Sequence, residues 1–143
     1  MILADKQYGI SEFSQIFHVK PSTLRYYEDE GLIKPLRTAN NRRYYTQTDA
    51  DWIKFLLCLK EAGLSIDELK QYVYWDQQGD QTITQRIALL NQAHERLTQQ
   101  ADEIQHHLQL LNDKITWYHQ RQQGQVDPNE VFRDYLARLG HEI

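Results

Sequence analysis

The chain has 143 residues, of which 41% are hydrophobic and 25% are charged, and its formal net charge is -4. These values are typical of one compact domain that carries an elongated element. The single cysteine, Cys58, excludes an intrachain disulfide and a metal site made of several thiolates from one chain. No apolar run is long enough to span a membrane, and the first five residues are too few and too acidic for a signal peptide, so we expect a cytoplasmic protein without a membrane partner.

The first third of the chain has the pattern of a helix-turn-helix. Apolar residues at helical spacing predict a first helix, and Pro21 favours the first turn of a second helix. Gly31 can supply the left-handed residue that ends this second helix. The apolar positions are Phe13, Ile16 and Phe17 in the first helix and Leu24 and Tyr27 in the second. This arrangement leaves the other face of the second helix free to contact a partner.

The free face of the second helix and the segment that follows it carry hydroxyl, aromatic and basic side chains. Residues 20–43 hold six basic residues against three acidic ones. Because electrostatic fields fall off within about 8 to 10 Å at physiological salt, this local excess matters more for phosphate binding than the total charge. We therefore expect a basic wing after the helix and contacts to double-stranded DNA from Ser22, Thr23, Arg25, Tyr26, Arg37, Arg42, Arg43 and Tyr45.

Three capping boxes mark the starts of the next helices. Each pairs a Ser or Thr with an acid or amide three residues later: Thr46 with Asp49, Ser65 with Glu68, and Thr82 with Gln85. The first of these helices should run to about Ala62 and end at Gly63, and the second should run to about Trp75. Residues 76–80 then form a breaking loop before the third helix.

The third of these helices carries an unbroken heptad pattern that reaches almost to Gly124. Its apolar seam consists of Ile83, Ile87, Leu90, Leu97, Ala101, Ile104, Leu108, Leu111 and Ile115, with His94 and Tyr118 at two further seam positions. A helix of about 40 residues is roughly 60 Å long, which is more than a small domain can cover. The seam therefore predicts a two-fold dimer rather than an intramolecular core.

Four short strings in this chain resemble the MerR family of bacterial transcription regulators. They are Tyr8-Gly9-Ile10, Thr23-Leu24-Arg25-Tyr26-Tyr27-Glu28, Gly31-Leu32-Ile33 and Gly63-Leu64-Ser65. The resemblance covers roughly residues 7 to 122. It implies a mainly α fold with a winged helix-turn-helix DNA-binding domain over residues 1–76, a coiled-coil dimerisation helix over 82–123 and a short C-terminal segment over 124–143. The wing departs from the family because it has the string Asn40-Asn41-Arg42-Arg43-Tyr44-Tyr45 where many members have Gly-Tyr-Arg, and this favours Arg43 over Arg42 as a contact.

The resemblance also implies a mechanism. MerR-like proteins pair the long helix antiparallel, and folding the seam about Ala101 sets Ile83 near Tyr118 and Leu90 near Leu111. The homodimer would bind a palindromic promoter element with an overlong spacer, and the effector-bound form would distort the DNA so that RNA polymerase, an indirect partner, meets both boxes in register. No catalytic set, phosphate loop or metal motif occurs in the sequence, so we expect neither an enzyme nor a cofactor.

Cys58 is the candidate effector-sensing residue. The string from Cys58 to Ile66 resembles a MerR subgroup whose lone cysteine responds to aldehydes, nitrosothiols or other electrophiles, which implies a role in stress response. Lys54 lies one turn before Cys58 and Lys60 is close, and nearby cations favour a reactive thiolate. The alternative is that the thiol is a small buried hydrophobe on an apolar helix.

Other interpretations stay open for the signal and for the function class. The neighbouring His106 and His107 point about 100° apart on a helix and cannot chelate a metal together. A small aromatic or apolar ligand could instead bind at the dimer junction, among Tyr72, Tyr74, Trp75, Trp117 and Tyr118. Asp127 and Pro128 open a short C-terminal helix that is too small to be a separate ligand-binding domain. A non-regulatory coiled-coil structural protein would explain the heptads but not the helix-turn-helix and wing.

Overall fold

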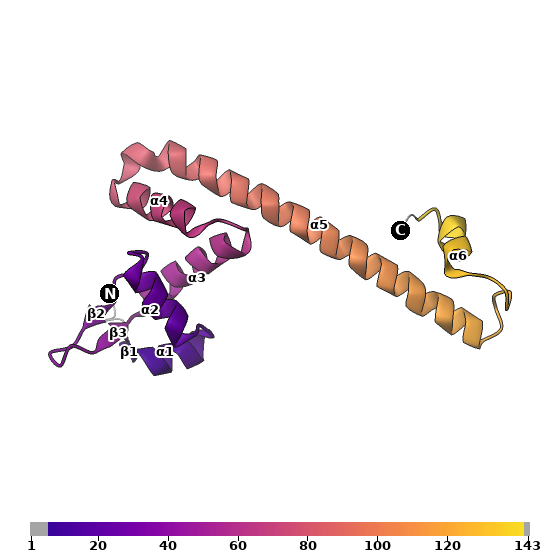
Figure 1. The fold of residues 1–143 in the computed structure, drawn as a ribbon, viewed down its shortest axis with the longest axis horizontal. Coiled ribbons are helices and arrows are strands. Elements are labelled where there is room, and N and C mark those ends of the chain that lie inside the picture. Colours follow the sequence, from indigo (N-terminus) through magenta and orange to yellow (C-terminus); the bar gives the residue numbers. More distant parts are fainter. Residues whose placement is uncertain (1–5, 142–143) are drawn as a thin grey trace, which may run out of the picture. The chain divides into compact units, whose positions relative to one another are not determined.

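The computed structural model describes residues 6–141, which form a short three-stranded sheet and a series of helices (Figure 1). The elements are β1 (Tyr8–Gly9), α1 (Ile10–Phe17), α2 (Pro21–Asp29), β2 (Leu36–Arg37), β3 (Arg43–Tyr45), α3 (Gln47–Glu61), α4 (Ile66–Gln77), the 3-10 turn η1 (Asp80–Thr82), α5 (Ile83–Gln122) and α6 (Phe132–Leu139). Internal contacts divide the chain into two compact units, which meet in sequence between Leu97 and Thr98. Each unit is described by itself below.

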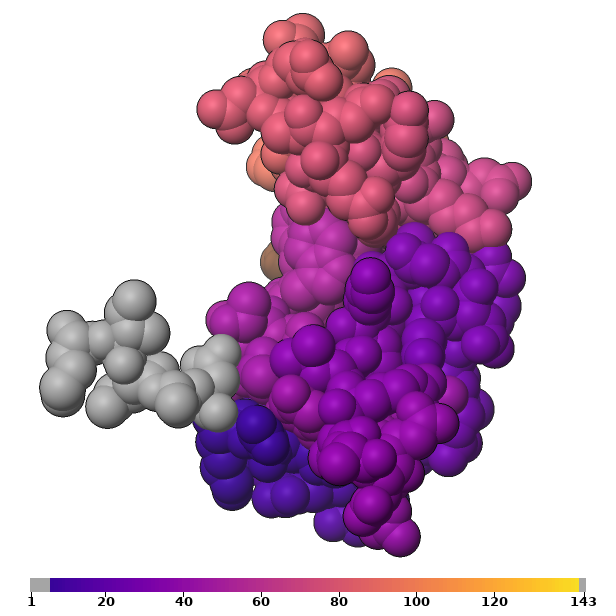
Figure 2. All heavy atoms as spheres, turned by 90° about the vertical axis from the view of Figure 1, so that its left-hand side faces the viewer, coloured from indigo at the N-terminus to yellow at the C-terminus, as the bar shows by residue number. Residues whose placement is uncertain are grey.

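The first unit is a helix-turn-helix with a wing, here called the head. Its sheet has the order β1-β3-β2 with antiparallel pairs, and Leu36 and Arg37 lie opposite Tyr44 and Arg43. Side chains from α1 to α4 close a common core that includes the fully buried Phe13, Leu24, Leu32, Ile53, Leu56, Leu64 and Leu69. In Figure 2 the violet and purple atoms of α2 and the wing form neighbouring parts of one face.

The first helix buries Phe13 and packs Phe17 against the core as the sequence predicted, but it leaves the third predicted position, Ile16, largely exposed. Ile16 is 47% exposed, whereas the nearby Ser14 is buried and its hydroxyl donates a 2.7 Å hydrogen bond to the carbonyl of Ile10. Phe13 and Phe17 pack together with ring centroids 4.7 Å apart. The helix has only eight residues, so the rings of Phe13 and Phe17 are enough to pack it against the core, and the third apolar residue, Ile16, is left exposed to solvent.

Two of the three predicted capping boxes are confirmed. Thr46 and Ser65 each accept a hydrogen bond from the backbone amide three residues later, and the acidic partner side chain accepts a bond from the cap amide. The end of α3 near Ala62, followed by Gly63 with φ of +90°, also agrees with the sequence. Helix α4 continues to Gln77, two residues beyond the predicted end at Trp75. These caps fix the boundaries on either side of the turn that links α3 to α4.

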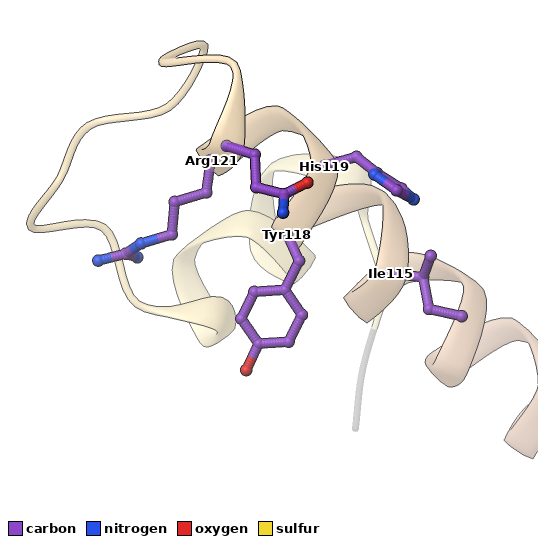
Figure 3. Close-up of a pocket in the computed structure, with 5 residues that line it drawn as sticks. Ile115, Tyr118, His119 and Arg121 are labelled. Carbon is purple, nitrogen blue, oxygen red and sulfur yellow. The ribbon is translucent and has the colours of Figure 1, made fainter.

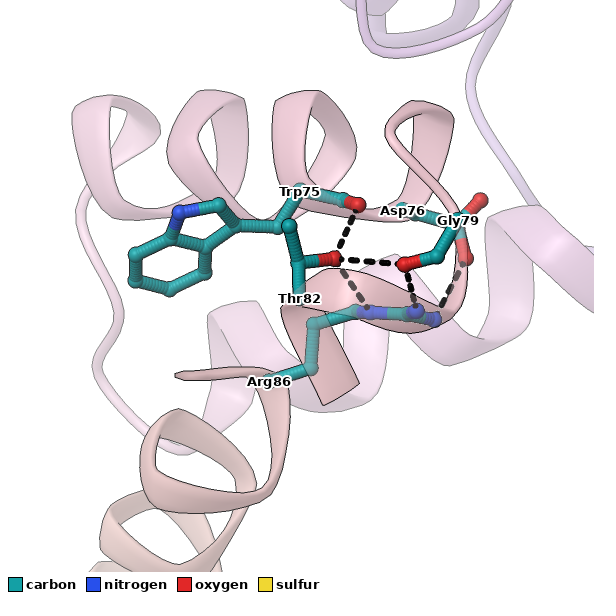
Figure 4. Close-up of polar contacts among 5 residues, drawn as sticks. All are labelled: Trp75, Asp76, Gly79, Thr82 and Arg86. Carbon is teal, nitrogen blue, oxygen red and sulfur yellow. Dashed lines mark hydrogen bonds and ion pairs between the residues drawn. The ribbon is translucent and has the colours of Figure 1, made fainter. Parts of the chain in front are cut away.

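The third predicted box, Thr82 with Gln85, is wrong. Thr82 is buried in η1, and its hydroxyl lies within hydrogen-bond distance of the carbonyls of Trp75 and Gly79 (Figure 4). Arg86, on the first turn of α5, donates to that hydroxyl at 3.2 Å and to the Gly79 carbonyl at 2.7 Å, and it pairs with Asp76 at 3.3 Å. The Thr82 side chain therefore closes the end of α4 and does not cap its own helix.

Helix α5 has the predicted length of 40 residues, and its first turns belong to the head. Leu89 and Ala93 are buried in the head core, and Leu90 and Leu97 are partly buried against it. None of the helices within residues 6–141 is long and apolar enough to cross a membrane. The boundary after Leu97 thus lies inside this helix, whereas the predicted domains separate residues 1–76 from 82–123.

The second unit consists of the rest of α5 with α6 packed against it. Trp117, Tyr135 and Leu136 are buried, and the indole of Trp117 donates a 3.0 Å hydrogen bond to Glu130. The C-terminal helix begins at Phe132 and not at Asp127 as predicted, because the Asp127 carboxylate accepts the amide of residue 129 in a local turn. The segment between α5 and α6 is therefore a loop fastened to the long helix.

Candidate nucleic-acid interface

Helix α2 presents its polar face to solvent as the sequence predicted. Ser22 and Arg25 are exposed, Tyr26 is 46% exposed, and Thr23 is half-buried. Leu24 and Tyr27 lie on the opposite face in the core. The helix starts at Pro21 after Lys20, whose side chain makes no capping hydrogen bond. Hydroxyls, an aromatic ring and a guanidinium are thus gathered along one side of one helix, the combination that phosphates and base edges bind.

The wing is the β2–β3 hairpin, and its turn is closed by backbone hydrogen bonds between Thr38 and residues 41 and 42. Asn41 adopts a left-handed conformation with φ of +61°, which asparagine tolerates better than most residues. The amide of Arg42 donates a further 3.2 Å bond to the Thr38 hydroxyl. The Arg42 side chain is exposed beside this turn and makes no ion pair with the other described residues.

Glu28, in the last turn of α2, connects this helix to the wing. One carboxylate oxygen accepts a 2.7 Å bond from Arg37 and the other accepts a 2.5 Å bond from Arg43. Burial alone would raise the pKa of Glu28, but the hydrogen bonds from Arg43 and Arg37 outweigh it and hold the pKa below its usual value. The hydrogen bond to Glu28 likewise raises the pKa of Arg43. Arg43, which the sequence favoured as the wing contact, is thus held by an acid, whereas Arg42 has no such partner among the described residues.

Tyr45 is a correction to the predicted site. Its side chain is only 1% exposed and its ring stacks on Phe13 with centroids 4.7 Å apart, so it cannot reach DNA. Burial also raises the pKa of Tyr45. The physical reason is the alternation of a strand, because Tyr44 and Tyr45 point to opposite faces of β3 and the second faces the core.

Sequence reasoning missed the role of the acidic residues that end α2. Besides Glu28, the carboxylate of Glu30 pairs with Lys70 of α4 at 2.5 Å. The last turn of α2 is therefore tied to the wing by one acid and to α4 by another. Only their position at the end of the predicted helix could have suggested this, since the partners lie on segments whose placement depends on the tertiary fold.

Comparison with known proteins decides the family. A family model described as "MerR HTH family regulatory protein" matches residues 8–79. The chain belongs to the MerR family. An uncharacterized HTH-type transcriptional regulator of Haemophilus influenzae is 30% identical over 112 residues, which are 78% of this chain and 83% of the relative. The HTH-type transcriptional regulator AdhR of Bacillus subtilis is 37% identical over 90 residues, 62% of this chain and 64% of the relative.

Solved structures of MerR proteins share the fold. HiNmlR, described as a MerR family regulator lacking the sensor domain and bound to promoter DNA, superposes with a TM-score of 0.78 at 28% identity over 89% of this chain and 98% of that one. A MerR family regulator of Listeria monocytogenes gives 0.67 at 34% identity, covering 78% of this chain and 86% of that one. The predicted fold is confirmed, and the chain is a MerR-family DNA-binding transcription regulator.

The candidate sensor of this MerR protein is exposed. Cys58 lies in α3 as a free, exposed thiol, so the alternative of a small buried hydrophobe does not describe the single chain. The two cations expected beside it are engaged elsewhere. The ammonium of Lys54 lies 5.2 Å from the centre of the Phe17 ring, and that of Lys60 donates to the carbonyl of Leu64 at 3.4 Å. The exposure of the thiol therefore favours the prediction that Cys58 senses an effector. The two lysines contact other groups, so the structure gives no support to their predicted activation of the thiol.

The aromatic residues considered for a ligand site are mostly packed against other rings. In the head, Tyr72 is buried with its ring 5.6 Å from that of Phe55 and 6.1 Å from that of Trp52. In the second unit, Trp117 is buried with its ring 5.5 Å from that of Phe132. Within residues 6–141 no group of three or more metal-ligating side chains comes together. The rings of Tyr72 and Trp117 are therefore occupied by packing within their own units, whereas Tyr118 is 52% exposed.

Proposed function

We propose that the chain works as a homodimer that binds a two-fold symmetric promoter element through α2 and the wing, and that an electrophile at Cys58 changes how the dimer distorts this DNA. The exposed seam of α5 carries this proposal. Ile87, Ile104 and Leu111 are 53%, 58% and 59% exposed in the single chain, although they are large apolar residues at heptad spacing. An apolar stripe of this length on an otherwise polar helix is the mark of a helix that pairs with another copy.

A hollow at the far end of α5 supports the same pairing (Figure 3). It measures about 400 Å³ and is lined by Ile115, Tyr118, His119, Arg121 and Gln122. Two of these, Ile115 and Tyr118, are seam residues that are more than half exposed. In an antiparallel dimer centred on Ala101 this end of the helix meets the first turn of the partner's α5, where the seam begins with Ile83.

A two-fold dimer gives the DNA contacts their geometry. Two identical α2 helices would enter successive major grooves of a palindrome, and the two wings would contact the flanking backbone. HiNmlR is described as bound to promoter DNA, and this chain matches nearly all of that protein. RNA polymerase then enters only indirectly, through the shape that the dimer imposes on the promoter.

Cys58 is the place where we put the effector response. HiNmlR is described as lacking the sensor domain, and this chain matches 98% of it. We therefore place the effector response within the helices and strands that the two proteins share. Cys58 is exposed on α3, one turn before the link to α4, so an adduct there enlarges a side chain between the DNA-binding helices and the long helix. Because the thiol is exposed in the single chain, the adduct would act on whatever packs against this surface of α3 in the DNA-bound dimer, and a change of packing there would reorient the elements on either side.

The DNA face is tested by gel-shift titration with the upstream region of the protein's own gene. Arg25→Ala and Arg42→Ala should weaken binding, and the slope of log affinity against log salt should drop by about one for each phosphate that the variant no longer neutralises. Arg133→Ala, an exposed arginine on α6, is the matched control and should bind like wild type. Wild-type affinity in both head variants would mean that DNA binds elsewhere.

The sensor is tested with a promoter reporter, with and without formaldehyde or methylglyoxal. Cys58→Ser and Cys58→Ala should bind DNA like wild type and fail to switch transcription, because neither side chain can form the thiol adduct. Normal induction in both variants would exclude Cys58 and turn attention to a ligand at the aromatic residues Trp75, Trp117 and Tyr118. Loss of DNA binding in both variants would instead show that Cys58 is structural.

A further inference from the structure

An acidic residue stands on the face that the proposed function assigns to DNA. Glu28 follows Arg25 by three residues on α2, so the two side chains lie on the same side of the helix. Its negative charge is repelled by phosphates, and simple electrostatics predicts that its removal tightens DNA binding. The contacts that Glu28 makes point the other way.

The carboxylate of Glu28 binds both strands of the wing at one pair of opposite residues. Arg37 on β2 and Arg43 on β3 are directly opposite each other in the antiparallel pair. Arg37 donates to one carboxylate oxygen at 2.7 Å, and Arg43 donates to the other at 2.5 Å. Arg37 also donates to the carbonyl of Asn41 at 3.3 Å, which extends the connection into the turn of the wing.

The wing has few other attachments to α2. Strand β2 has two residues, Leu36 and Arg37, and both are exposed, Leu36 by 54%. Of the three residues of β3, only Tyr45 is buried, and its ring packs on α1. Backbone pairing holds the strands to each other and to β1, and Tyr45 shares the head core with Leu24 and Tyr27 of α2. Among the described residues, the polar side-chain link between the exposed part of the hairpin and the end of α2 is made by Glu28 with Arg37 and Arg43.

From this geometry we infer that Glu28 is a positioning residue, which orders the wing against α2 and thereby strengthens DNA binding although it is acidic. The inference rests on the proposed DNA face. It assigns Arg37 and Arg43 first to holding the wing, and it leaves Arg42, exposed at the turn, to contact the backbone. A wing ordered before binding saves the entropy that two free arginines and their strands would lose on the DNA.

Asp29 provides a matched control for this inference. It is the next residue in α2, it is exposed, and it makes no ion pair with the other described residues. Asp29→Asn and Glu28→Gln therefore remove the same charge from the same turn of the same helix. Electrostatics alone predicts that neither variant weakens DNA binding, whereas a positioning role predicts that Glu28→Gln weakens it and Asp29→Asn does not.

The experiment is a salt-dependent DNA titration of the full chain and both variants, with hydroxyl-radical footprinting. Asp29→Asn should bind as tightly as wild type or tighter. Glu28→Gln should bind about five- to 150-fold more weakly, which corresponds to the cost of ordering two arginines on binding. It should also lose protection of the flanking backbone while keeping that of the central grooves. Binding of Glu28→Gln at wild-type strength or better would overturn the inference.

A second experiment, in an Arg37→Ala background, distinguishes a positioning role of Glu28 from a general loss of folding. In an Arg37→Ala chain half of the link is already absent, so adding Glu28→Gln should cost less affinity than it costs in wild type. Equal cost in both backgrounds would show that Glu28 does not act through Arg37 and would contradict the inference. If wild type itself failed to bind the promoter, the proposed function would fall before any variant was compared.

Discussion

Replacing Leu111 with alanine is the most direct test of the seam. Leu111 lies in the half of α5 that belongs to the second unit, and 59% of it is exposed in the single chain. It does not pack in the head core, unlike Leu90 and Leu97, which are partly buried there. A change at Leu111 therefore reports on pairing between copies and leaves the fold of the head alone.

The size of the effect follows from the exposed fraction. Complete burial of a leucine side chain is worth about 1.5 to 3 kcal/mol, and the 59% that is still exposed leaves about 0.9 to 1.8 kcal/mol to be gained on pairing. Symmetry places the change twice in the dimer, so Leu111→Ala should cost about 2 to 3.5 kcal/mol. That cost corresponds to a roughly 30- to 400-fold higher dissociation constant of the dimer.

The assay is sedimentation equilibrium over a range of concentrations, with Leu139→Ala as the matched variant. Leu139 carries the same side chain, is 44% exposed and lies on α6, so it is not one of the seam residues of α5. Leu139→Ala should dimerise like wild type, and Leu111→Ala should dissociate at concentrations where wild type does not. Equal dissociation constants for the two variants, or a monomeric wild type at micromolar concentration, would refute the seam and the palindrome that depends on it.

Three further results are expected from the head. Tyr45→Phe should keep the DNA affinity of wild type and raise the unfolding free energy by about 1 to 3 kcal/mol, because the buried Tyr45 hydroxyl has no hydrogen-bond partner among the described residues. Weaker DNA binding by this variant would show that Tyr45 belongs to the DNA interface after all. Thr82→Val should lower the unfolding free energy in urea by about 1 to 3 kcal/mol, because the buried Thr82 hydroxyl then neither donates to the carbonyl of Trp75 or Gly79 nor accepts from Arg86. Thr84→Val, on the exposed side of α5, should change it by less than about 0.5 kcal/mol. The pKa of Glu28 is lowered in the folded chain, so its stabilisation is complete above the usual value of 4.5 and is lost as the pH falls through the lowered pKa; acid titration of stability should therefore be less steep for Glu28→Gln.

Local signals in the sequence predicted the helices well. Thr46 and Ser65 satisfy the amides of their own first turns, and the heptads set the length of α5 through spacing alone. Such features depend on residues within one or two turns, and their energetics are nearly independent of the rest of the fold. Thr82 shows the limit, because the same cap pattern was present but stronger partners, Arg86 and the end of α4, were supplied by tertiary contacts.

The candidate site was predicted in composition but not in detail. The exposed face of α2 follows from helical period, and the structure retains it. The wing was harder, because alternation in a three-residue strand decides which of Tyr44 and Tyr45 is buried, and the register of that strand depends on its pairing with β1. The link from Glu28 to Arg37 and Arg43 joins residues nine and fifteen positions apart, across a turn whose course no local pattern specifies.

At the corner between α4 and α5, one arginine side chain of α5 binds the end of α4. Arg86 belongs to the first turn of α5, yet its guanidinium holds the side chain of Asp76 and the carbonyl of Gly79 at the end of α4. Rotating the start of α5 about its own axis would withdraw this group and leave the Gly79 carbonyl without it. We therefore expect the start of α5 and the end of α4 to turn together, so that a rotation of the first turn of the long helix also moves α4.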